Sequence, residues 1–395
     1  MDEKILYLCK SFSKTSETFI YDELLELNKN EIDVSVLTYK RINEQKRPFE
    51  PVHVVQKPNR WNPIRLYNRL RFADVSQPYV ASFWPQVRSR LKSKIAEIQP
   101  DLIHAQFGPM GAVVNPVAES MGIPLITHFR GYDISRLLPD PFWEDQYEAL
   151  FENADALIGM SNHICGRLTD LGGSDEQVKL LHGGIRLSNF EYDPPLPRFE
   201  GETVRCLHVG RLVEKKAPLD LVRAFDRAVQ LSQGKYDLRL KIAGDGPLRE
   251  DVERLIIELG LSAKVDCLGS LPHAEVIEQM KKSHLYTQHC KTASNGDQEG
   301  QGITFVEASA TGLPIVTTRH NGIPDVVEDG TNGYLVEEGD VEAMGERIAN
   351  LANNPEEWAE LSEGGRRRVE RKFDLFKQIE KQISIYHSIL KSTQT

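Results

Sequence analysis

Short apolar runs alternate with segments of helical periodicity along most of the chain. The short runs are rich in residues that favour strands, and the stretches between them are typical of crossover helices. The strand-like runs form two series, at 5–9, 34–38, 102–105, 125–128 and 156–160, and at 204–209, 238–243, 265–268, 284–288, 315–317 and 333–336. This βαβ rhythm predicts an α/β protein with two parallel sheets.

A proline-rich segment, Tyr-Asp-Pro-Pro-Leu-Pro at 192–197, separates the two series. Proline continues neither a helix nor an interior strand, so this segment is predicted to be a linker. A length of 395 residues also exceeds what one hydrophobic core usually supports. We therefore predict a first domain over 1–192, a second domain over 203–372 and a carboxyl-terminal amphipathic helix within 373–391. The apolar stripe of this helix consists of Ile379, Ile383, Tyr386 and Leu390.

The composition is that of an ordinary soluble protein, with 40% hydrophobic and 27% charged residues. A formal net charge of −10 argues against a nucleic-acid partner. The cysteines are odd in number, scattered and without a C-x-x-C pair, at Cys9, Cys165, Cys206, Cys267 and Cys290. This argues against a disulfide framework and a zinc site, and favours a reducing compartment. The first residues lead into a strand-like run without a long apolar signal segment, and no stretch approaches membrane-spanning length, so a cytoplasmic location is expected.

Positive charge is nevertheless concentrated between Lys57 and Lys94. This segment contains nine basic residues and one acidic residue, Asp74. The basic residues are Lys57, Arg60, Arg65, Arg69, Arg71, Arg88, Arg90, Lys92 and Lys94. The aromatic residues interleaved among them are Trp61, Tyr67, Phe72, Tyr79, Phe83 and Trp84. A basic, aromatic surface suits an anionic membrane, but a solvated helix face with core aromatics would give the same pattern, so both interpretations stay open.

Two carboxylates eight residues apart mark the candidate site. Glu299 lies in a polar, glycine-rich loop, and Glu307 lies in an apolar run. Residues 292–298 cannot hold regular structure, whereas the run from Ile303 has the pattern of a buried helix that ends at 311–314. A flexible loop therefore leads into a helix amino terminus, where unpaired N–H groups and flanking glycines would accept a phosphate. A carboxylate beside a phosphate suits a ligand that also carries hydroxyls, such as a nucleotide sugar.

The same residues resemble a family signature. Glu299 and Glu307 form an E-x7-E pair that is followed by an A-x-A-x-G-x-P run at 308–314. This pattern resembles the signature of the retaining glycosyltransferases of family 4. The resemblance implies that Glu299 accepts hydrogen bonds from the hexose of a nucleotide diphosphate sugar, and that Glu307 accepts them from its ribose.

Further segments of the second domain share this resemblance. The sequence at 210–216 matches G-R-L-x-x-x-K, which implies that Arg211 and Lys216 clamp the donor diphosphate and stabilise its charge as it leaves. The turn at 244–247 matches a G-x-G-P segment near the nucleotide, although a purely structural turn would look the same. Downstream, Asp325 replaces the usual glutamate of G-x-P-E. The donor-binding residues implied by these matches are Gly244, Asp245, Gly246, Gly300, Gln301, Gly302, Ile303, Thr304 and Glu307.

The first domain resembles enzymes that assemble exopolysaccharides such as colanic acid and amylovoran. The resemblance rests on an S-E-T-F-I motif at 16–20 and on the segments 103–108 and 127–135. It implies that this domain holds the acceptor and one edge of the catalytic site. The acceptor-side candidates are Ser16, Glu17, Thr18, His104, Phe107, Gly108, His128, Tyr132 and Asp133.

One position departs from the family pattern. Most members have a histidine immediately before the glycine of H-G-x-D, near the transferred sugar, whereas this chain has Arg130 there and His128 two residues earlier. Residues two apart on a strand point to the same side, so either side chain could line the cleft. We assign Arg130 to the catalytic set together with Glu299, Arg211 and Lys216. His128 is equally well explained as a core histidine.

The resemblance implies a GT-B architecture, in which two doubly wound Rossmann-like domains face each other across a cleft and the carboxyl-terminal helix crosses back onto the first domain. It implies retaining transfer of a hexose from a UDP- or GDP-sugar to a hydroxyl of a saccharide acceptor. That acceptor is expected to be lipid-linked, at the inner face of the cell membrane. No cofactor and no metal ion are expected, because Arg211, Lys216 and the helix end neutralise the diphosphate.

Two other classes of function remain open. A non-hydrolysing nucleotide-sugar epimerase of the same architecture would need acid and base groups around the sugar, and no residue stands out for that task. A non-catalytic scaffold of a polysaccharide assembly complex would be expected to have lost Glu299, Arg211 or Lys216. All three residues are present.

Overall fold

The computed structural model describes residues 3–14, 18–59, 61–232 and 234–392. The chain forms two compact units, of which one contains the chain up to His182 and again from Phe376, and the other contains Gly183–Leu375. The proline-rich segment at 192–197 lies within the second unit, where the Asp193 N–H donates to the Thr311 carbonyl at 3.0 Å. The predicted linker is therefore packed onto the second unit.

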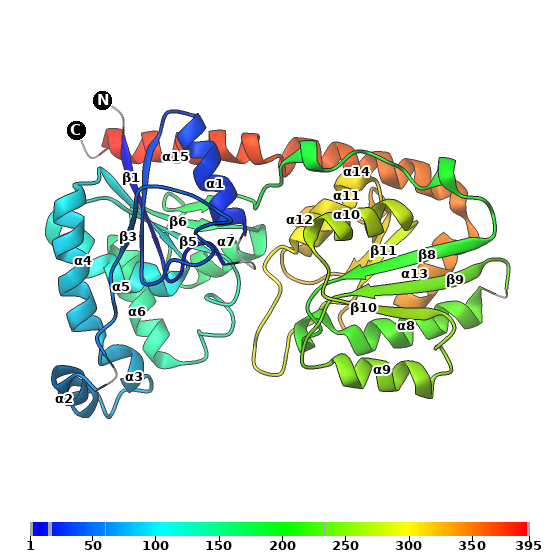
Figure 1. Cartoon of the computed structure of the whole chain (residues 1–395), viewed down its shortest axis with the longest axis horizontal. Helices are drawn as coiled ribbons and strands as arrows, with labels where there is room; N and C mark the ends of the chain where they lie inside the picture. The colour runs from blue at the N-terminus through cyan, green and yellow to red at the C-terminus, as the bar shows by residue number, and fades with distance from the viewer. Residues whose placement is uncertain (1–2, 15–17, 60, 233, 393–395) are drawn as a thin grey trace. The chain divides into compact units, whose positions relative to one another are not determined.

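The first unit is built on a parallel sheet (Figure 1). The strand order of this sheet is β3-β2-β1-β4-β5-β6-β7. Its strands are β1 Lys4–Cys9, β2 Asp33–Thr38, β3 Val52–Val54, β4 Leu102–Gln106, β5 Leu125–Phe129, β6 Ala156–Gly159 and β7 Val178–Leu180. Central β1 pairs with both of its neighbours, so Tyr7 lies opposite Val36 of β2 and His104 of β4. The sequence pattern predicts the inner strands and misses β3 and β7, the short strands at the two edges.

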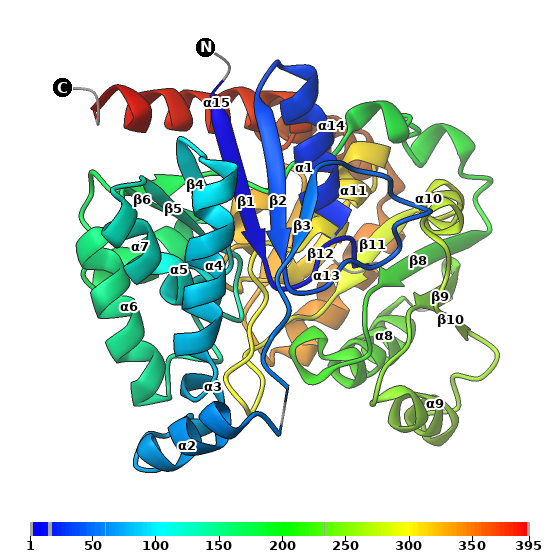
Figure 2. The same ribbon diagram turned by 60° about the vertical axis from the view of Figure 1, so that its left-hand side comes forward.

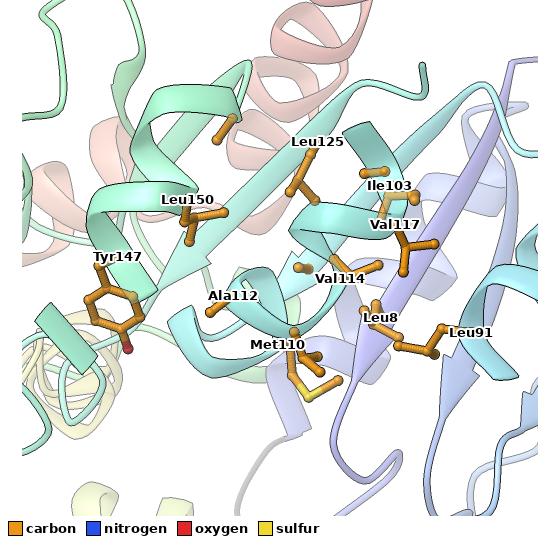
Figure 3. Packing of buried hydrophobic residues seen from close by; sticks show 14 of the residues in the cluster. Leu8, Leu91, Ile103, Met110, Ala112, Val114, Val117, Leu125, Tyr147 and Leu150 are labelled. Atoms are coloured by element: carbon orange, nitrogen blue, oxygen red, sulfur yellow. The ribbon is translucent and has the colours of Figure 1, made fainter. Parts of the chain in front are cut away.

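Helices cover both faces of this sheet, because right-handed crossovers that run in opposite directions from β1 and β4 place their helices on opposite sides. The helices are α1 Thr18–Lys29, α2 Pro63–Arg71, α3 Pro78–Ala81, α4 Trp84–Ile98, α5 Gly108–Met121, α6 Pro141–Asn153, α7 Asn162–Asp170 and α15 Leu375–Ser392. Leu8 of β1 and Ile103 of β4 pack with Leu91 of α4 and with Val114 and Val117 of α5 (Figure 3).

The carboxyl-terminal helix α15 packs on the first unit through its predicted stripe. Tyr386 is fully buried, and its hydroxyl lies 2.7 Å from His104 Nδ1 and 3.2 Å from the Tyr7 hydroxyl. Gln382, one turn earlier, also hydrogen-bonds to Tyr7 and Tyr386. Side chains from β1, β4 and α15 thus form one buried polar cluster.

The second unit has a parallel sheet with the order β10-β9-β8-β11-β12-β13. Its strands are β8 Thr203–Val209, β9 Asp237–Ala243, β10 Val265–Gly269, β11 Leu285–Gln288, β12 Ile315–Thr318 and β13 Gly333–Val336. Its helices are α8 Pro218–Leu231, α9 Arg249–Glu258, α10 His273–Lys282, α11 Ile303–Thr311, α12 Ile323–Val326, α13 Val341–Asn353 and α14 Trp358–Lys372. Helices α8, α9 and α13 pack together, as do α10, α11 and α14 (Figure 1). Within the described residues, no helix is both long and apolar enough to span a membrane.

Candidate active site

The strongest candidate site lies where the second sheet changes direction. From adjacent β8 and β11 the chain proceeds to opposite edges of the sheet, and the carboxyl ends at such a switch point are where open α/β sheets bind ligands. Lys216 follows β8 in the short helix η3 Glu214–Lys216, and Glu299 lies in the loop after β11. Lys216 Nζ and Glu299 Oε2 are 3.0 Å apart. The fold thus joins two residues that the sequence placed in the catalytic set.

This ion pair is largely withdrawn from solvent, with side chains 11% and 16% exposed. Burial alone would raise the pKa of Glu299, but the charges of Lys216 and Lys215 outweigh it and hold that pKa at about 2. Burial would lower the pKa of Lys216, but the Glu299 carboxylate raises that pKa above its ordinary value. Both side chains are therefore charged near neutral pH.

Arg211 supplies a second cation at this edge of the sheet. Its side chain is exposed, and no ion-pair partner for it occurs in the described parts of the chain. The charge of Arg211 acts to lower the pKa of Lys216, so the two cations are close enough to interact electrostatically. An exposed guanidinium without a partner is suited to bidentate binding of a phosphate.

The loop that carries Glu299 is irregular, as the sequence predicts, but neighbouring side chains hold it in place. Glu214 accepts hydrogen bonds from the Ser294 N–H and hydroxyl at 2.8 and 2.7 Å. Lys215 Nζ lies 3.1 Å from Asp297 Oδ1 and donates to the Gln298 carbonyl at 2.9 Å. Lys215, which adjoins the matched motif, therefore anchors this loop.

His320 and Glu338, which sequence reasoning missed, position the backbone of Glu299. Nε2 of the buried His320 accepts a hydrogen bond from the Glu299 N–H at 3.1 Å. A backbone N–H can only donate, so the ring proton sits on Nδ1, which hydrogen-bonds to Glu338. Glu338 also accepts from the Thr292 N–H at 2.8 Å. The sequence signal that could have identified His320 is its position two residues after β12, at the same edge of the sheet.

The amino terminus of α11 follows Glu299 directly. Gly302 at the N-cap has a φ of 78° and provides no side-chain cap. A Cβ on Gly302 would lie 2.4 Å from the Phe305 ring, so only glycine fits this turn. Ile303 is exposed and Thr304 half-buried, and the first N–H groups of a helix without a side-chain cap are suited to binding an anion.

The side chain of Gln301, one of the expected donor-binding residues, is engaged inside the second unit. Its side chain is fully buried, its Oε1 accepts from the Gly183 N–H at 2.8 Å, and its Nε2 donates to the Gly183 carbonyl at 3.0 Å. Both ends of the amide are thus used inside the unit. Gly300, next to it, is also buried. The side chain of Gln301 therefore holds the backbone before α11 in place.

Glu307 lies on α11 and is buried, with Oε1 2.9 Å from His273 Nε2. His273 begins α10, and its side chain is exposed. Sequence reasoning did not find His273, because its partner is distant along the chain. The second carboxylate of the E-x7-E pair is therefore accompanied by an imidazole.

The turn after β9 supports the turn that carries Arg211. A Cβ on Gly244 would lie 1.8 Å from the Gly210 carbonyl oxygen, and one on Gly246 would lie 2.5 Å from that of Leu212. The Leu212 N–H also donates to the Asp245 carbonyl at 3.0 Å. These contacts favour the structural interpretation of Gly244 and Gly246, because the two turns pack backbone against backbone.

In the first unit, Arg130 is buried in a polar network. Its Nη2 lies 3.0 Å from Glu23 Oε1 and donates to Gln106 Oε1 at 2.8 Å. Its guanidinium also lies 4.2 Å from the centre of the Phe19 ring. Glu23 of α1, which the sequence did not single out, thus already neutralises the cation. This geometry is at odds with Arg130 as a guanidinium that is free to donate hydrogen bonds to a phosphate.

His104 and His128 are core histidines and do not line an open acceptor site. Both are buried, and their rings stack with centroids 5.7 Å apart. Burial and the charge of Arg130 lower the pKa of His104 to about 3 and that of His128 well below its ordinary value. His104 is further engaged by Tyr386. Both imidazoles are therefore neutral.

Asp133 also differs from its predicted role. Its carboxylate is buried and accepts hydrogen bonds from the N–H groups of Gly108, Arg130 and Gly131 at 3.0, 3.1 and 2.9 Å. Asp133 therefore fastens the loop after β5 to the start of α5. Phe107 and Tyr132 lie beside this loop with ring centroids 5.5 Å apart, and Tyr132 is exposed. Of the remaining acceptor-side candidates, Ser16 and Glu17 lie outside the described residues, and Thr18 begins α1.

Two family models match the chain, one over each half. The model described as Glycosyltransferase Family 4 matches residues 16–189, and the model described as Glycosyl transferases group 1 matches residues 193–368. Together they span most of the 395 residues. The boundary between them falls near the proline-rich segment.

Among curated proteins, the chain is similar to WcaL of Escherichia coli, provisionally named a colanic acid biosynthesis glycosyltransferase, at 27% identity over 83% of this chain and 78% of WcaL. WcaL of Salmonella typhimurium is 29% identical over 71% of this chain, and the match spans 64% of that protein's length. The amylovoran biosynthesis glycosyltransferase AmsK of Erwinia amylovora is 28% identical over 69% of this chain and 67% of AmsK.

The fold is shared with solved structures. HepE of Anabaena in complex with UDP has a TM-score of 0.76 and 19% identity, over 98% of this chain and 100% of that chain. Sucrose-phosphate synthase from Thermosynechococcus elongatus has a TM-score of 0.74 and 18% identity, over 99% of this chain and 100% of that chain. With the two parallel sheets, these likenesses confirm the predicted fold class. Both halves of the chain thus match glycosyltransferase models, and the chain is a glycosyltransferase of the GT-B fold.

Proposed function

We propose that this glycosyltransferase moves a hexose from a nucleotide diphosphate sugar to a hydroxyl of a saccharide acceptor, with retention of the anomeric configuration. The observation that carries the proposal is the Lys216–Glu299 ion pair at the switch point of the second sheet. A cation and an anion in contact and largely withdrawn from solvent match a ligand with a diphosphate at one end and hydroxyls at the other.

The donor diphosphate would bind between Arg211, Lys216 and the amino terminus of α11. Arg211 is exposed and without an ion-pair partner among the described residues, and Gly302 leaves the helix uncapped. Fixed cations and N–H groups stabilise the charge that develops on a leaving diphosphate without having to reorganise. Glu299 would accept hydrogen bonds from the hexose hydroxyls, and Glu307 would accept them from the ribose.

In the proposed reaction, the bond between the anomeric carbon and the diphosphate oxygen breaks, and the acceptor oxygen forms the new glycosidic bond on the same face. The departing phosphate oxygen takes the acceptor proton, so the products are a nucleoside diphosphate and a glycoside. No metal ion is required in this scheme, because Arg211, Lys216 and the helix end carry the countercharge.

We place the reaction in exopolysaccharide or cell-surface glycan biosynthesis, with a lipid-linked acceptor at the inner face of the cell membrane. The names of WcaL and AmsK support the biosynthetic context. Structures of HepE are described with UDP and with UDP-glucose, whereas a relative from Mycolicibacterium smegmatis is named as GDP-mannose-dependent. The proposal therefore names a UDP- or GDP-sugar as donor.

A two-stage experiment tests the proposal. A thermal-shift panel of UDP, GDP, ADP and their sugars identifies the donor, because a ligand that binds the native state raises its stability. The selected donor is then incubated with and without saccharide acceptors, and the anomeric configuration of the product is determined by NMR. An α-linked product from an α-configured donor supports the proposal. A new sugar nucleotide formed without acceptor would indicate an epimerase, and binding without turnover across acceptors would indicate a scaffold.

A further inference from the structure

Helix α2, Pro63–Arg71, has the reverse of the usual amphipathic arrangement. The residues that it buries are polar, Arg65 and Asn68. Its exposed side carries Ile64, Tyr67 and Leu70, which are 59%, 66% and 77% exposed, and Trp61 just before the helix is 72% exposed. These large side chains recur every three residues, so they form one stripe along the helix. An apolar stripe turned to solvent is unfavourable unless another surface covers it.

The orientation of α2 is fixed by satisfied polar contacts on its buried side. Arg65 Nη1 donates to the Pro58 carbonyl at 3.0 Å, and its guanidinium stacks 4.6 Å from the centre of the Tyr79 ring. Asn68 Nδ2 donates to the Ser82 carbonyl at 3.2 Å. Rotating the helix to bury the apolar stripe would break these bonds and leave the carbonyls of Pro58 and Ser82 without these donors. The exposed stripe is therefore built into the fold.

The structure narrows the basic surface expected between Lys57 and Lys94. Arg65 is buried under α2, and Arg88 donates to the Val113 carbonyl at 3.1 Å. Lys94 pairs with Glu97, and Lys57 lies 4.6 Å from the centre of the Tyr39 ring. Each of these four cations makes a separate contact, so the basic residues that the structure describes in this segment are not gathered on one continuous surface.

Two arginines do accompany the apolar stripe. Arg69 and Arg71 lie on the last turn of α2, are exposed, and have no ion-pair partner in the described parts of the chain. They stand out against a protein whose formal net charge is −10. Helices α2 and α3 lie beside one another where α4 begins, at the margin of the first unit (Figure 2). The stripe thus combines aromatic, aliphatic and cationic side chains at a margin.

We propose that α2 docks this protein on an anionic phospholipid bilayer. The stripe of Trp61, Ile64, Tyr67 and Leu70 enters the headgroup region, and Arg69 and Arg71 contact lipid phosphates. A short helix with aromatic and aliphatic residues on one side and arginines beside them has the composition of an interfacial membrane helix. A second copy of this acidic chain would bring like charges together, whereas the arginines are complementary to anionic lipid. This inference rests on the proposed function in one respect: the membrane surface on which α2 docks is where a lipid-linked acceptor would be presented.

Sedimentation of the full chain with vesicles of phosphatidylcholine containing graded amounts of phosphatidylglycerol tests the proposal. The wild-type protein is expected to bind increasingly with phosphatidylglycerol content and to be released by salt. Arg69→Gln with Arg71→Gln should lower the partition constant about 25-fold, because each cation is expected to contribute a factor of about 5, and should weaken the salt dependence. Tyr67→Ser with Leu70→Ser should lower it at least about tenfold at every salt concentration.

Two matched controls separate docking from general exposure. Ile257, which is 70% exposed on α9 of the second unit, is replaced by serine, and Lys92 on α4, which hydrogen-bonds to Ser120, is replaced by glutamine. Both variants should bind vesicles like the wild type. All variants should keep wild-type melting temperatures and nucleotide-induced thermal shifts, so that a failed donor assay is distinguished from failed docking. Wild-type indifference to anionic lipid, equal binding by the α2 variants, or a dimer that only the α2 variants lose would overturn the proposal.

Discussion

Lys216 Nζ and Glu299 Oε2 lie 3.0 Å apart, although Lys216 follows β8 and Glu299 follows β11. The two strands are neighbours at the point where the sheet changes direction, so the segments that follow them bring the two charges together at the same edge of the sheet. Each charge offsets the desolvation of the other, and removing one leaves its partner uncompensated in a mostly buried position. The same pair is thus both a structural tie and the proposed centre of the donor site.

Glu299→Gln and Lys216→Ala are each expected to reduce transfer at least about 100-fold while the fold persists, because each removes an interaction with the transition state. Steady-state kinetics with the identified donor, together with circular dichroism, provides the measurement. Lys264→Ala is a suitable control, since Lys264 makes a half-exposed pair with Asp237 at 2.8 Å elsewhere in the unit. Near wild-type turnover in either site variant would contradict the assignment.

The pKa of Glu299 predicts how stability depends on acid. Because the folded-state pKa is held at about 2, below the ordinary value of 4.5, the ion pair contributes stability that is present above pH 4.5 and is lost as the pH falls towards 2. The contribution is on the order of 3 kcal/mol at neutral pH. We expect the difference in unfolding free energy between wild type and Glu299→Gln to shrink markedly from pH 6 to pH 3 in urea titrations. The exposed Glu337 offers the control substitution Glu337→Gln, whose difference should stay small at both pH values.

His320 is expected to act by positioning Glu299. His320→Ala removes the acceptor of the Glu299 N–H and the link to Glu338, so kcat should fall on the order of 10- to 100-fold with a smaller change in KM. His320→Gln should recover part of kcat, because an amide can accept from that N–H and donate to Glu338. Limited proteolysis at 292–299 should accelerate in the alanine variant.

His284 provides a matched control for this prediction, because it is also buried and accepts a backbone hydrogen bond, from Arg205 at 3.0 Å, but precedes β11 at the opposite end of the strand. His284→Ala should lower stability without the selective loss of kcat. An equal loss of kcat in both alanine variants would reduce His320 to a general structural role.

Arg130 and Glu23 form a buried ion pair, and the interaction between them can be separated from the contribution of each residue alone. Arg130→Met leaves the Glu23 carboxylate buried without its cation, which should cost about 3–5 kcal/mol of unfolding free energy. Combining it with Glu23→Leu should recover much of that loss, because no buried charge then remains. Urea unfolding of the two single variants and the double variant measures this coupling. Additive losses in the double variant would contradict a direct pair.

The sequence predicts the inner strands well because parallel strands buried on both faces are nearly continuous apolar runs. It misses β3 and β7, where three residues at an edge carry too little pattern. In the site, the motifs locate Glu299, Lys216 and Arg211, but they do not show which polar side chains the fold uses internally. The side chains of Gln301 and Asp133 hydrogen-bond to backbone groups. Those backbone groups are distant in sequence, so only the tertiary structure identifies them as partners.

Metal independence is the last expectation, and it follows from where the charges lie. A divalent cation on the diphosphate would need carboxylate ligands, yet the Glu299 carboxylate is already bound to Lys216, and Arg211 and the α11 amino terminus offer positive charge instead. Transfer by the wild type should therefore change less than about twofold in millimolar EDTA, whereas Arg211→Ala should lower it at least about tenfold with or without Mg²⁺. Turnover assays on the same preparations, with the chelator removed by dialysis as a control, make the comparison. Complete loss of activity in EDTA, restored by Mg²⁺, would assign the countercharge to a metal ion and leave Arg211 and Lys216 with a supporting role.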